Sequence, residues 1–182
     1  MNAFVIMGVS GCGKSSVGAQ VAQELGWTWI DGDDFHSESN KAKMCQGIPL
    51  TDEDRVEWLD TLNAQLHQRL QQGQRTILLC SALRQRYRDR FRAQFPHLPF
   101  VFLEISEAEA LRRVSVRAAT HMFPPALVAS QFATLESPKE ETDVLTLDAE
   151  RQLEEICAAI VNWVQPAGEK PCSTFPMHIG EK

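Results

Sequence analysis

The feature that most constrains this sequence is a glycine-rich run, GVSGCGKS, at residues 8–15. Its spacing, G-x-x-x-x-G-K-S, is typical of a phosphate-binding loop between a strand and a helix. An apolar run, residues 3–7, precedes the motif, and Val17, Val21 and Leu25 follow it at helical spacing. In that context the backbone N–H groups of the loop and the positive end of the helix face one anionic group. The motif therefore predicts that the chain binds a nucleoside triphosphate.

The loop positions have distinct expected roles. Lys14 would reach the β- and γ-phosphates, and the hydroxyl of Ser15 would ligate Mg²⁺. Cys12 lies near the positive end of the helix, which favours its thiolate. Either oxidation or alkylation of Cys12 blocks ATP binding, or Cys12 is only a small residue where serine or glycine would also fit. The residues predicted to bind ATP here are Gly8, Val9, Ser10, Gly11, Cys12, Gly13, Lys14, Ser15 and Ser16.

Size and charge limit the class of protein. The 182 residues are enough for one well-buried domain, predicted over residues 1–165, and residues 166–182 are expected to form a flexible tail. A net charge of −6 provides no basic surface for nucleic acid, and no apolar run is long enough to cross a membrane. Five cysteines without C-x-x-C spacing favour a reduced, cytoplasmic protein over a disulfide or zinc scaffold.

Five apolar runs alternate with helical patterns along the chain. They lie at residues 3–7, 27–30, 76–80, 100–105 and 144–147. This alternation predicts a three-layer α/β fold with a five-stranded parallel sheet and right-handed crossovers. Ligands of such sheets bind beyond the carboxyl ends of the strands. We therefore expect Asp31, Ser81 and Glu104 to emerge at that edge, beside the phosphate loop.

The phosphate loop alone does not separate a kinase from a switch or a motor. No D-x-x-G follows a strand, and residues 40–43, NKAK, lack the acid of a guanine-reading N-K-x-D, so a GTPase switch is disfavoured. The strand at 76–80 also ends without the aspartate that commonly holds Mg²⁺. We therefore predict that the carboxylate of Asp31, at the tip of the neighbouring strand, holds a water bound to Mg²⁺. Asp33 would orient the acceptor hydroxyl or accept its proton, with Gly32 letting an extended tip aim both carboxylates at one site. The alternative is an acidic turn that only caps the next segment.

Arg113 and Arg117 are four residues apart, so they lie on one face of a predicted helix. They precede a helix break at residues 120–125. This arrangement suits a lid that closes over the triphosphate and brings a guanidinium to the transferred group. Both are predicted to bind ATP, and Arg117 to act in catalysis; alternatively both lie on a solvated face. His121, at the break, would touch phosphate or cap a helix end.

Basic and polar side chains between the second and third predicted strands, and just after the third, could bind an anionic acceptor. An arginine would grip a carboxylate through two parallel hydrogen bonds. Each candidate could instead be an ordinary surface residue, and Asp54 could simply cap a helix. The basic run at 84–92 is expected to be mostly a solvated helix face. The candidates are Lys43, Arg55 and Arg84, with His36, Asn40 and Asp54 offering hydrogen bonds.

These residues together resemble the gluconokinases, small P-loop kinases that phosphorylate D-gluconate at its 6-hydroxyl with ATP and Mg²⁺. The resemblance implies a P-loop kinase fold with a substrate flap at about residues 34–58 and a lid at about 113–135. Members are commonly homodimers. It places Mg²⁺ near Ser15 and Asp31 and gluconate near Asp33, Arg55, Lys43 and Arg84, and it implies lid roles for Arg113, Arg117 and His121. His36 and His121 are also predicted to bind the substrate. The segments that carry it are GVSGCGKS (8–15), DGDDFH (31–36), NKAKMCQGIPLTDEDRVEWL (40–59), CSALRQRYRDRFR (80–92) and SQFATLESP (130–138).

The sequence departs from the family pattern at a few positions. Cys12 stands where serine is common, and Ser37 and Glu57 stand where prolines are common. The lid reads RAATHMF, one residue longer than usual and without the glycine that precedes the histidine. Two alternatives stay open, a shikimate-like or nucleotide kinase and a non-catalytic ATP sensor. The flap is polar and basic, with Trp58 on a core face, which disfavours a nucleotide as the phosphoryl acceptor. Asp33, the carboxylate expected beside the acceptor hydroxyl, disfavours a sensor, because a protein that only binds ATP does not need it.

Overall fold

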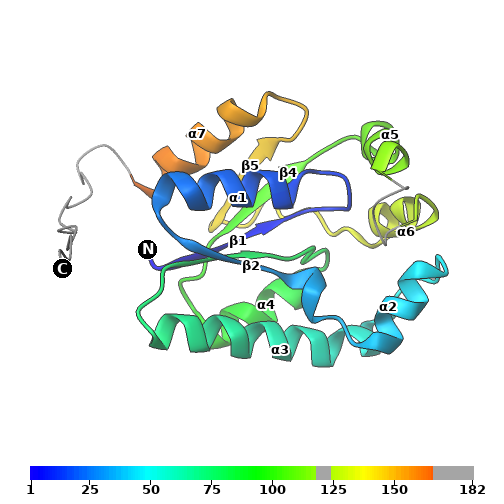
Figure 1. Ribbon diagram of the computed structural model, residues 1–182, viewed down its shortest axis with the longest axis horizontal. Helices are drawn as coiled ribbons and strands as arrows, with labels where there is room; N and C mark the ends of the chain where they lie inside the picture. The colour runs from blue at the N-terminus through cyan, green and yellow to red at the C-terminus, as the bar shows by residue number, and fades with distance from the viewer. Residues whose placement is uncertain (118–123, 166–182) are drawn as a thin grey trace, which may run out of the picture.

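The computed structural model describes residues 1–117 and 124–165. Its five strands form one parallel sheet in the order β2-β3-β1-β4-β5, which confirms the predicted three-layer α/β fold (Figure 1). Each strand lies within one residue of its predicted bounds. The strands are β1 (Ala3–Met7), β2 (Thr28–Asp31), β3 (Thr76–Leu79), β4 (Phe100–Glu104) and β5 (Val144–Asp148).

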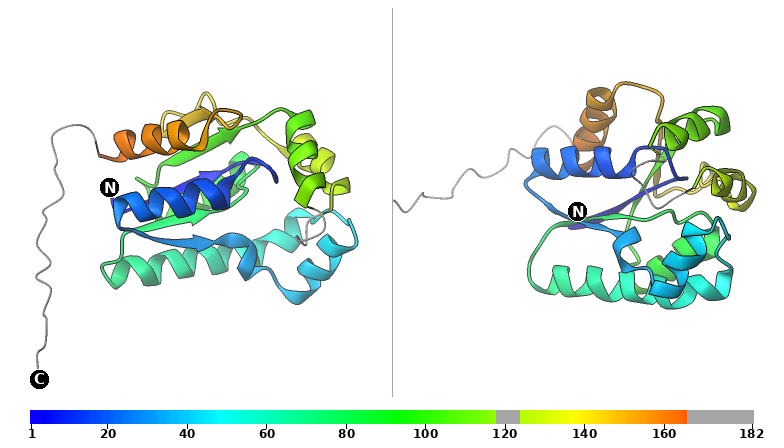
Figure 2. Two further views of the ribbon diagram at one scale, coloured as in Figure 1. Left: turned by 45° about the horizontal axis from the view of Figure 1, so that its top comes forward. Right: turned by 45° about the vertical axis from the view of Figure 1, so that its right-hand side comes forward.

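The helices cover both faces of the sheet and its carboxyl edge. Helices α1 and α7 lie on one face and α3 and α4 on the other, whereas α2, α5 and α6 lie beyond the carboxyl ends of the strands (Figures 1 and 2). The helices are α1 (Lys14–Leu25), α2 (Glu38–Cys45), α3 (Asp52–Gln71), α4 (Gln85–Gln94), α5 (Glu107–Arg117), α6 (Ala126–Thr134) and α7 (Leu153–Val164), with a 3₁₀ helix, η1 (Gly32–Phe35), after β2.

Two apolar cores form because side chains of a strand alternate between the faces of the sheet. In β1, Phe4 and Ile6 join the core under α1 and α7, whereas Val5 and Met7 join the core over α3 and α4. All five residues of β1 are buried, as expected for the central strand of a parallel sheet. The sheet therefore forms a rigid platform whose carboxyl edge carries the polar residues.

The basic run in α4 corrects one sequence expectation. It was expected to be mostly solvated, but Arg88 is only 1% exposed. Its guanidinium pairs with Glu141 at 2.5 Å and donates to the carbonyls of Ala82 and Leu83. Ala82 has a left-handed φ of 43°, at the turn that leaves β3. Arg88 is buried because it ties this turn to the segment before β5.

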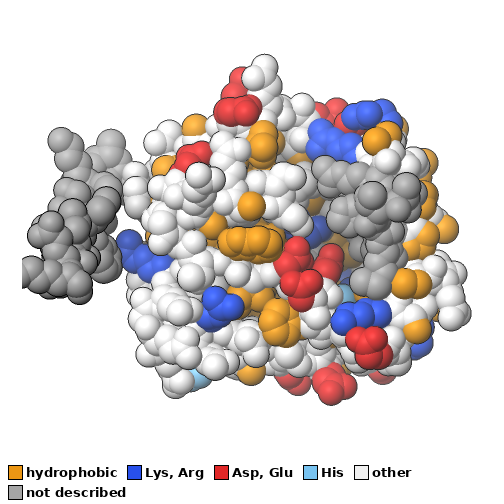
Figure 3. Space-filling model, viewed as in Figure 1, with side chains coloured by type: hydrophobic (Ala, Val, Ile, Leu, Met, Phe, Trp, Pro, Cys, Tyr) orange, Lys and Arg blue, Asp and Glu red, His pale blue; other side chains and the backbone are white. Residues whose placement is uncertain are grey.

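Helix α1 begins at Lys14, so the lysine and Ser15 lie in its first turn. No helix in the described ranges is long and apolar enough to span a membrane. The surface seen in Figure 3 carries acidic and basic side chains interspersed over the described residues.

Candidate active site

The phosphate loop joins the carboxyl end of β1 to the first turn of α1, as the motif predicted. Gly11 has a φ of +86°, and a Cβ there would lie 2.8 Å from the carbonyl oxygen of Ala110, so only glycine lets the loop pass this close to α5. Lys14 Nζ donates to the carbonyl oxygens of Gly8 and Val9, at 3.0 and 3.2 Å. The lysine is thus folded back over its own loop.

The charge of Lys14 is held by its surroundings. Burial would lower its pKa, but attraction to the nearby Cys12, Asp33 and Asp31 raises it above the ordinary lysine value. The ammonium group is therefore charged at neutral pH. A charged lysine beside amide N–H groups at a helix N-terminus makes an anion site.

The acidic tip after β2 differs from the predicted extended form. Residues 32–35 form η1, and Asp31 is its N-cap: Asp31 Oδ1 accepts from the Asp33 amide at 3.1 Å. Asp31 Oδ2 accepts from the hydroxyl of Ser15 at 3.1 Å. Gly32 is needed here for space rather than for freedom, because a Cβ would lie 2.6 Å from the carbonyl oxygen of Leu79. Asp31 consequently links the phosphate loop to the residue that carries the second carboxylate.

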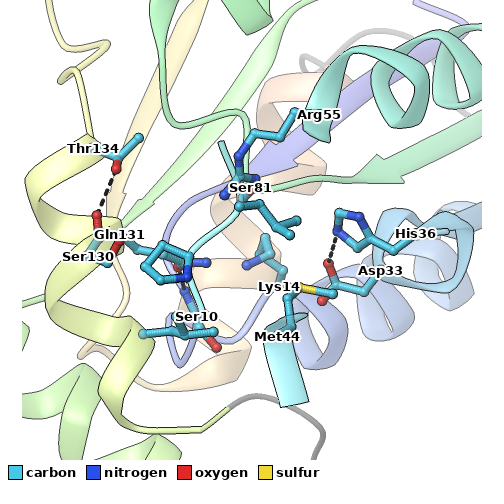
Figure 4. Close-up of a pocket in the computed structure, with 13 residues that line it drawn as sticks. Ser10, Lys14, Asp33, His36, Met44, Arg55, Ser81, Ser130, Gln131 and Thr134 are labelled. Carbon is cyan, nitrogen blue, oxygen red and sulfur yellow. Dashed lines mark hydrogen bonds and ion pairs between the residues drawn. The ribbon is translucent and has the colours of Figure 1, made fainter. Parts of the chain in front are cut away.

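One pocket brings the loop and the acidic tip together, with Lys14 and Asp33 both in its wall (Figure 4). It holds about 570 Å³ of empty space, a figure that includes open solvent at its mouth. The walls come from the loop, η1, α2, α3 and α6. The lining residues are Ser10, Lys14, Asp33, His36, Met44, Pro49, Leu50, Arg55, Ser81, Leu127, Ser130, Gln131 and Thr134.

Arg55 and His36 give this pocket a buried cation and a neutral ring. Arg55 is 9% exposed, and its Nε has no hydrogen-bond partner among the described residues. Burial lowers its pKa, yet a guanidinium keeps its proton in proteins. His36 is 5% exposed and stacks on Trp58 with ring centroids 4.3 Å apart. Burial, then the charges of Arg55 and Lys41, lower its pKa to about 4, so the imidazole is neutral at pH 7.

Two of the residues predicted to bind the anionic acceptor substrate, Lys43 and Arg84, are not part of the pocket wall. Lys43 Nζ contacts Asp54 Oδ1 at 2.6 Å, while Asp54 also completes a capping box with Thr51. Arg84 lies 3.4 Å from Asp52. Asn40, which was offered as a hydrogen-bonding residue, is buried and donates to the carbonyl of Asp54 at 2.7 Å.

Arg113 belongs to a second cavity on the other side of the loop. It pairs with Glu109 at 2.7 Å and donates to the carbonyl oxygen of Ala149 at 3.0 Å. This cavity lies between α5, the start of α1 and the β5–α7 connection. Its lining includes Cys12, Gly13, Ser16, Val17, Arg112, Arg113, Val116, Ala149, Arg151, Leu153 and Ile156.

Three further predictions concern the lid and the cysteine. The side chain of Arg117, the last residue of α5, and the whole of His121 lie outside the described part of the chain. Cys12 is only 1% exposed and belongs to the apolar core under α1. Redox-sensitive thiols are solvent-accessible, so this burial argues against the predicted reactivity of Cys12.

Helix α6 supplies site residues that sequence reasoning missed. Gln131 Oε1 accepts from the backbone amide of Ser10 at 2.6 Å, across 121 positions of sequence. Leu127, Ser130 and Thr134 lie on the same wall of the pocket. The segment SQFATLESP carried the family resemblance, which was the available signal, but no local pattern indicates that this helix faces the phosphate loop.

The arrangement combines three chemical elements within one pocket: an anion-binding loop, a carboxylate and a buried cation without a carboxylate partner among the described residues. Such a set can hold a phosphate chain opposite a small molecule that bears both a hydroxyl and an acidic group. Position and charge are the main protein contributions to phosphoryl transfer.

Comparisons with known proteins agree with this arrangement. The sequence profile of the AAA domain family matches residues 4–138. The chain is 42% identical to the thermosensitive gluconokinase of Escherichia coli over 80% of its length and 78% of that protein. It is 39% identical to a probable gluconokinase of Mus musculus, over 87% and 95%. A gluconokinase structure from Sinorhizobium meliloti superposes with a TM-score of 0.77 at 38% identity, over 90% and 95% of the two chains. The chain therefore belongs to the gluconokinase family of P-loop kinases.

Proposed function

We propose that this protein transfers the terminal phosphoryl group of ATP to the 6-hydroxyl of D-gluconate. Membership of the gluconokinase family supports this activity. The single observation that carries it is the pocket in which Lys14 and Asp33 lie opposite Arg55, a buried guanidinium whose Nε has no partner among the described residues. A molecule with a carboxylate at one end and a hydroxyl at the other matches this arrangement, with its carboxylate at Arg55 and its hydroxyl at Asp33.

The triphosphate would occupy the phosphate loop. Lys14 and the loop amides would neutralise the β- and γ-phosphates, while the adenosine would lie in the second cavity, beside Arg113 and the β5–α7 connection. We propose that Arg117 and His121 contact the phosphates from the lid at residues 113–135. The side chain of Arg113 already borders the cavity that the nucleotide would fill.

Gluconate would lie between Arg55 and Asp33. Arg55 would hold its carboxylate, since Arg binds carboxylates through two parallel hydrogen bonds. Asp33 would orient the terminal hydroxyl toward the γ-phosphate and receive its proton. His36, as a neutral imidazole, would exchange hydrogen bonds with the hydroxyl groups between. Lys43 and Arg84, in contact with Asp54 and Asp52, would support the flap at residues 34–58 instead of binding gluconate directly.

The residues at the loop fit a magnesium ion. Ser15 Oγ and Asp31 Oδ2 lie 3.1 Å apart, and both are the hard oxygen donors that Mg²⁺ prefers. Mg²⁺ is commonly bound by one or two protein oxygens together with substrate phosphates. When bound, it would neutralise charge that develops on the phosphate oxygens. Ser15 Oγ and Asp31 Oδ2 would hold the ion beside the loop, and Asp31 also accepts a hydrogen bond from the amide of Asp33 through Oδ1.

A coupled assay of ADP release tests the reaction. Gluconate should give turnover, whereas shikimate and nucleoside monophosphates should not. Asp33→Asn should lower kcat by about 10²–10⁴-fold while the dissociation constant for ATP stays nearly unchanged. No ADP release with any acceptor, despite tight ATP binding, would favour a non-catalytic sensor. Equal loss of turnover and ATP affinity in Asp33→Asn would show that Asp33 is structural.

We also propose that residues 1–165 act as one catalytic domain and that the protein is a cytoplasmic homodimer. The resemblance to gluconokinases, which are commonly homodimers, supports the dimer, and five cysteines without C-x-x-C spacing support the cytoplasmic location. Analytical ultracentrifugation of the full chain at several concentrations tests the oligomeric state. A mass equal to one chain at every concentration would overturn the dimer.

A further inference from the structure

Trp58 of α3 packs behind the wall of the pocket where gluconate, the phosphoryl acceptor, would bind. It is 3% exposed and is not among the residues that line the pocket. Two of its neighbours are functionally placed: Gly32, which precedes Asp33, and His36, which lines the pocket. The sequence predicted only that Trp58 lies on a core face.

The indole fixes one side of a single peptide group. Trp58 Nε1 donates to the carbonyl oxygen of Gly32 at 2.7 Å. The N–H of the same peptide group, which belongs to Asp33, donates to Asp31 Oδ1 at 3.1 Å. Both polar groups of the Gly32–Asp33 peptide are therefore held, and Gly32 itself is packed too closely against Leu79 for any side chain. The backbone at Asp33 has little freedom left.

These bonds continue to the phosphate loop. Asp31 Oδ2 accepts from the hydroxyl of Ser15, in the first turn of α1. A hydrogen-bonded chain thus runs from Ser15 through Asp31 and the Gly32–Asp33 peptide to Trp58. Such a chain sets the position of the Asp33 backbone, from which the carboxylate extends, relative to the loop that would hold the triphosphate.

The ring of Trp58 also holds His36. The two rings stack at 4.3 Å with an interplanar angle of 13°. His36 Nε2 lies 3.9 Å from Asp33 Oδ1, across the mouth of η1 (Figure 4). One buried side chain therefore supports both residues that η1 and its C-cap present to the acceptor.

From this geometry we infer that Trp58 is a positioning residue for phosphoryl transfer, which it serves by fixing Asp33 and His36 opposite the phosphate loop. The inference rests on the proposed function. This role differs from general packing because it depends on two specific contacts, the hydrogen bond from the indole N–H to the Gly32 carbonyl and the stacking on the His36 ring. Misplacing a reacting group by about 1 Å can cost ~10²-fold in rate.

The test compares two buried tryptophans. Trp58→Phe removes the N–H donor and shrinks the stacked ring. Trp27→Phe is the matched control: Trp27 is 8% exposed, lies in the other core, and its Nε1 has no hydrogen-bond partner among the described residues. Kinetics with gluconate and ATP, ATP affinity by calorimetry, and thermal stability are measured for both.

We expect Trp58→Phe to lower kcat/KM for gluconate by about 10- to 100-fold, with ATP affinity within about twofold of the unsubstituted protein. Trp27→Phe should leave both quantities within about twofold. Identical kinetics for the two variants would overturn the inference. So would a parallel loss of ATP affinity in Trp58→Phe, because that indicates a general collapse of the site.

A second substitution covers the case in which Trp58→Phe does not fold. Replacing Trp58 with β-(3-benzothienyl)alanine keeps the ring shape and removes only the N–H donor. We expect about a fivefold or greater loss of kcat/KM, since one partner of a buried hydrogen bond is removed. Unchanged turnover in this variant would overturn the role of the Gly32 contact.

One measurement does not depend on activity. Hydrogen exchange at the Asp33 amide, followed by NMR, should be about tenfold faster in Trp58→Phe than in Trp27→Phe. Equal exchange would overturn the inference even if no acceptor is phosphorylated. Absence of turnover in the unsubstituted protein, with faster exchange in Trp58→Phe, would instead refute only the proposed function.

Discussion

Replacing Arg55 with methionine should separate gluconate binding from ATP binding. Arg55 is buried in the acceptor pocket, with its Nε unpaired among the described residues and its guanidinium carbon 5.9 Å from the centre of the Tyr87 ring. Methionine has a similar length and suits a buried site, but it cannot bind a carboxylate. The substitution therefore removes the cation and leaves most of the packing.

The magnitude follows from the contacts that Arg55 would make. A hydrogen bond to a charged group contributes about 1.5–3 kcal/mol. Two such bonds to one carboxylate, counted conservatively because they are not additive, give a loss of about 2–4 kcal/mol, or ~30- to 1,000-fold in kcat/KM for gluconate. The KM for ATP should change by less than about threefold, because the phosphate loop keeps all its donors.

Stability should respond in the opposite sense. Burial lowers the pKa of Arg55, which means that the folded protein disfavours this charge relative to water. Removing a buried charge that lacks a full partner is often neutral or stabilising, whereas the contact with Tyr87 offsets about 0.5–1 kcal/mol. We expect the free energy of unfolding to stay unchanged or to rise by up to about 1 kcal/mol, which raises Tm by ~2–4 °C at most.

Steady-state kinetics with each substrate and denaturant unfolding check both parts. Arg69→Met, at the far end of the same helix, is the control and should leave both kinetic constants unchanged. An unchanged KM for gluconate in Arg55→Met would refute the assignment. A fall in gluconate and ATP affinity together, with a loss of several kcal/mol in stability, would show that Arg55 is structural.

Two further predictions concern stability. His36 has a folded pKa of about 4, below the ordinary 6.5. Between these two values the unfolded chain binds a proton at His36 that the folded protein does not bind. The free energy of unfolding should therefore fall by about 2 kcal/mol between pH 7.5 and 5. Urea unfolding should show this loss, and His36→Phe, which keeps a stacked ring, should abolish it; an equal loss in both proteins would contradict the assignment. Arg88→Met should cost about 3 kcal/mol, because Glu141 loses a buried partner, whereas Arg90→Met removes an exposed ion pair and should cost less than ~1 kcal/mol. Similar losses for the two arginine variants would refute the role of Arg88.

The sequence by itself determined the features that depend on neighbouring residues. Strand bounds followed from short apolar runs, and the phosphate loop followed from the spacing of Gly8, Gly13, Lys14 and Ser15 between a strand and a helix. Asp31 could be placed near Ser15 because adjacent parallel strands end at the same edge of a sheet. Such patterns are readable because each depends on a few consecutive positions.

Only the tertiary structure decided which distant residues meet and which charges are buried. Gln131 contacts Ser10 across 121 positions, and Arg88 is buried by a segment about fifty residues downstream. The neutral His36 depends on burial against Trp58, and Lys43 is held by Asp54 rather than by the pocket. The physical reason is that a side chain's environment is set by how helices pack on the sheet, and no local periodicity records that packing.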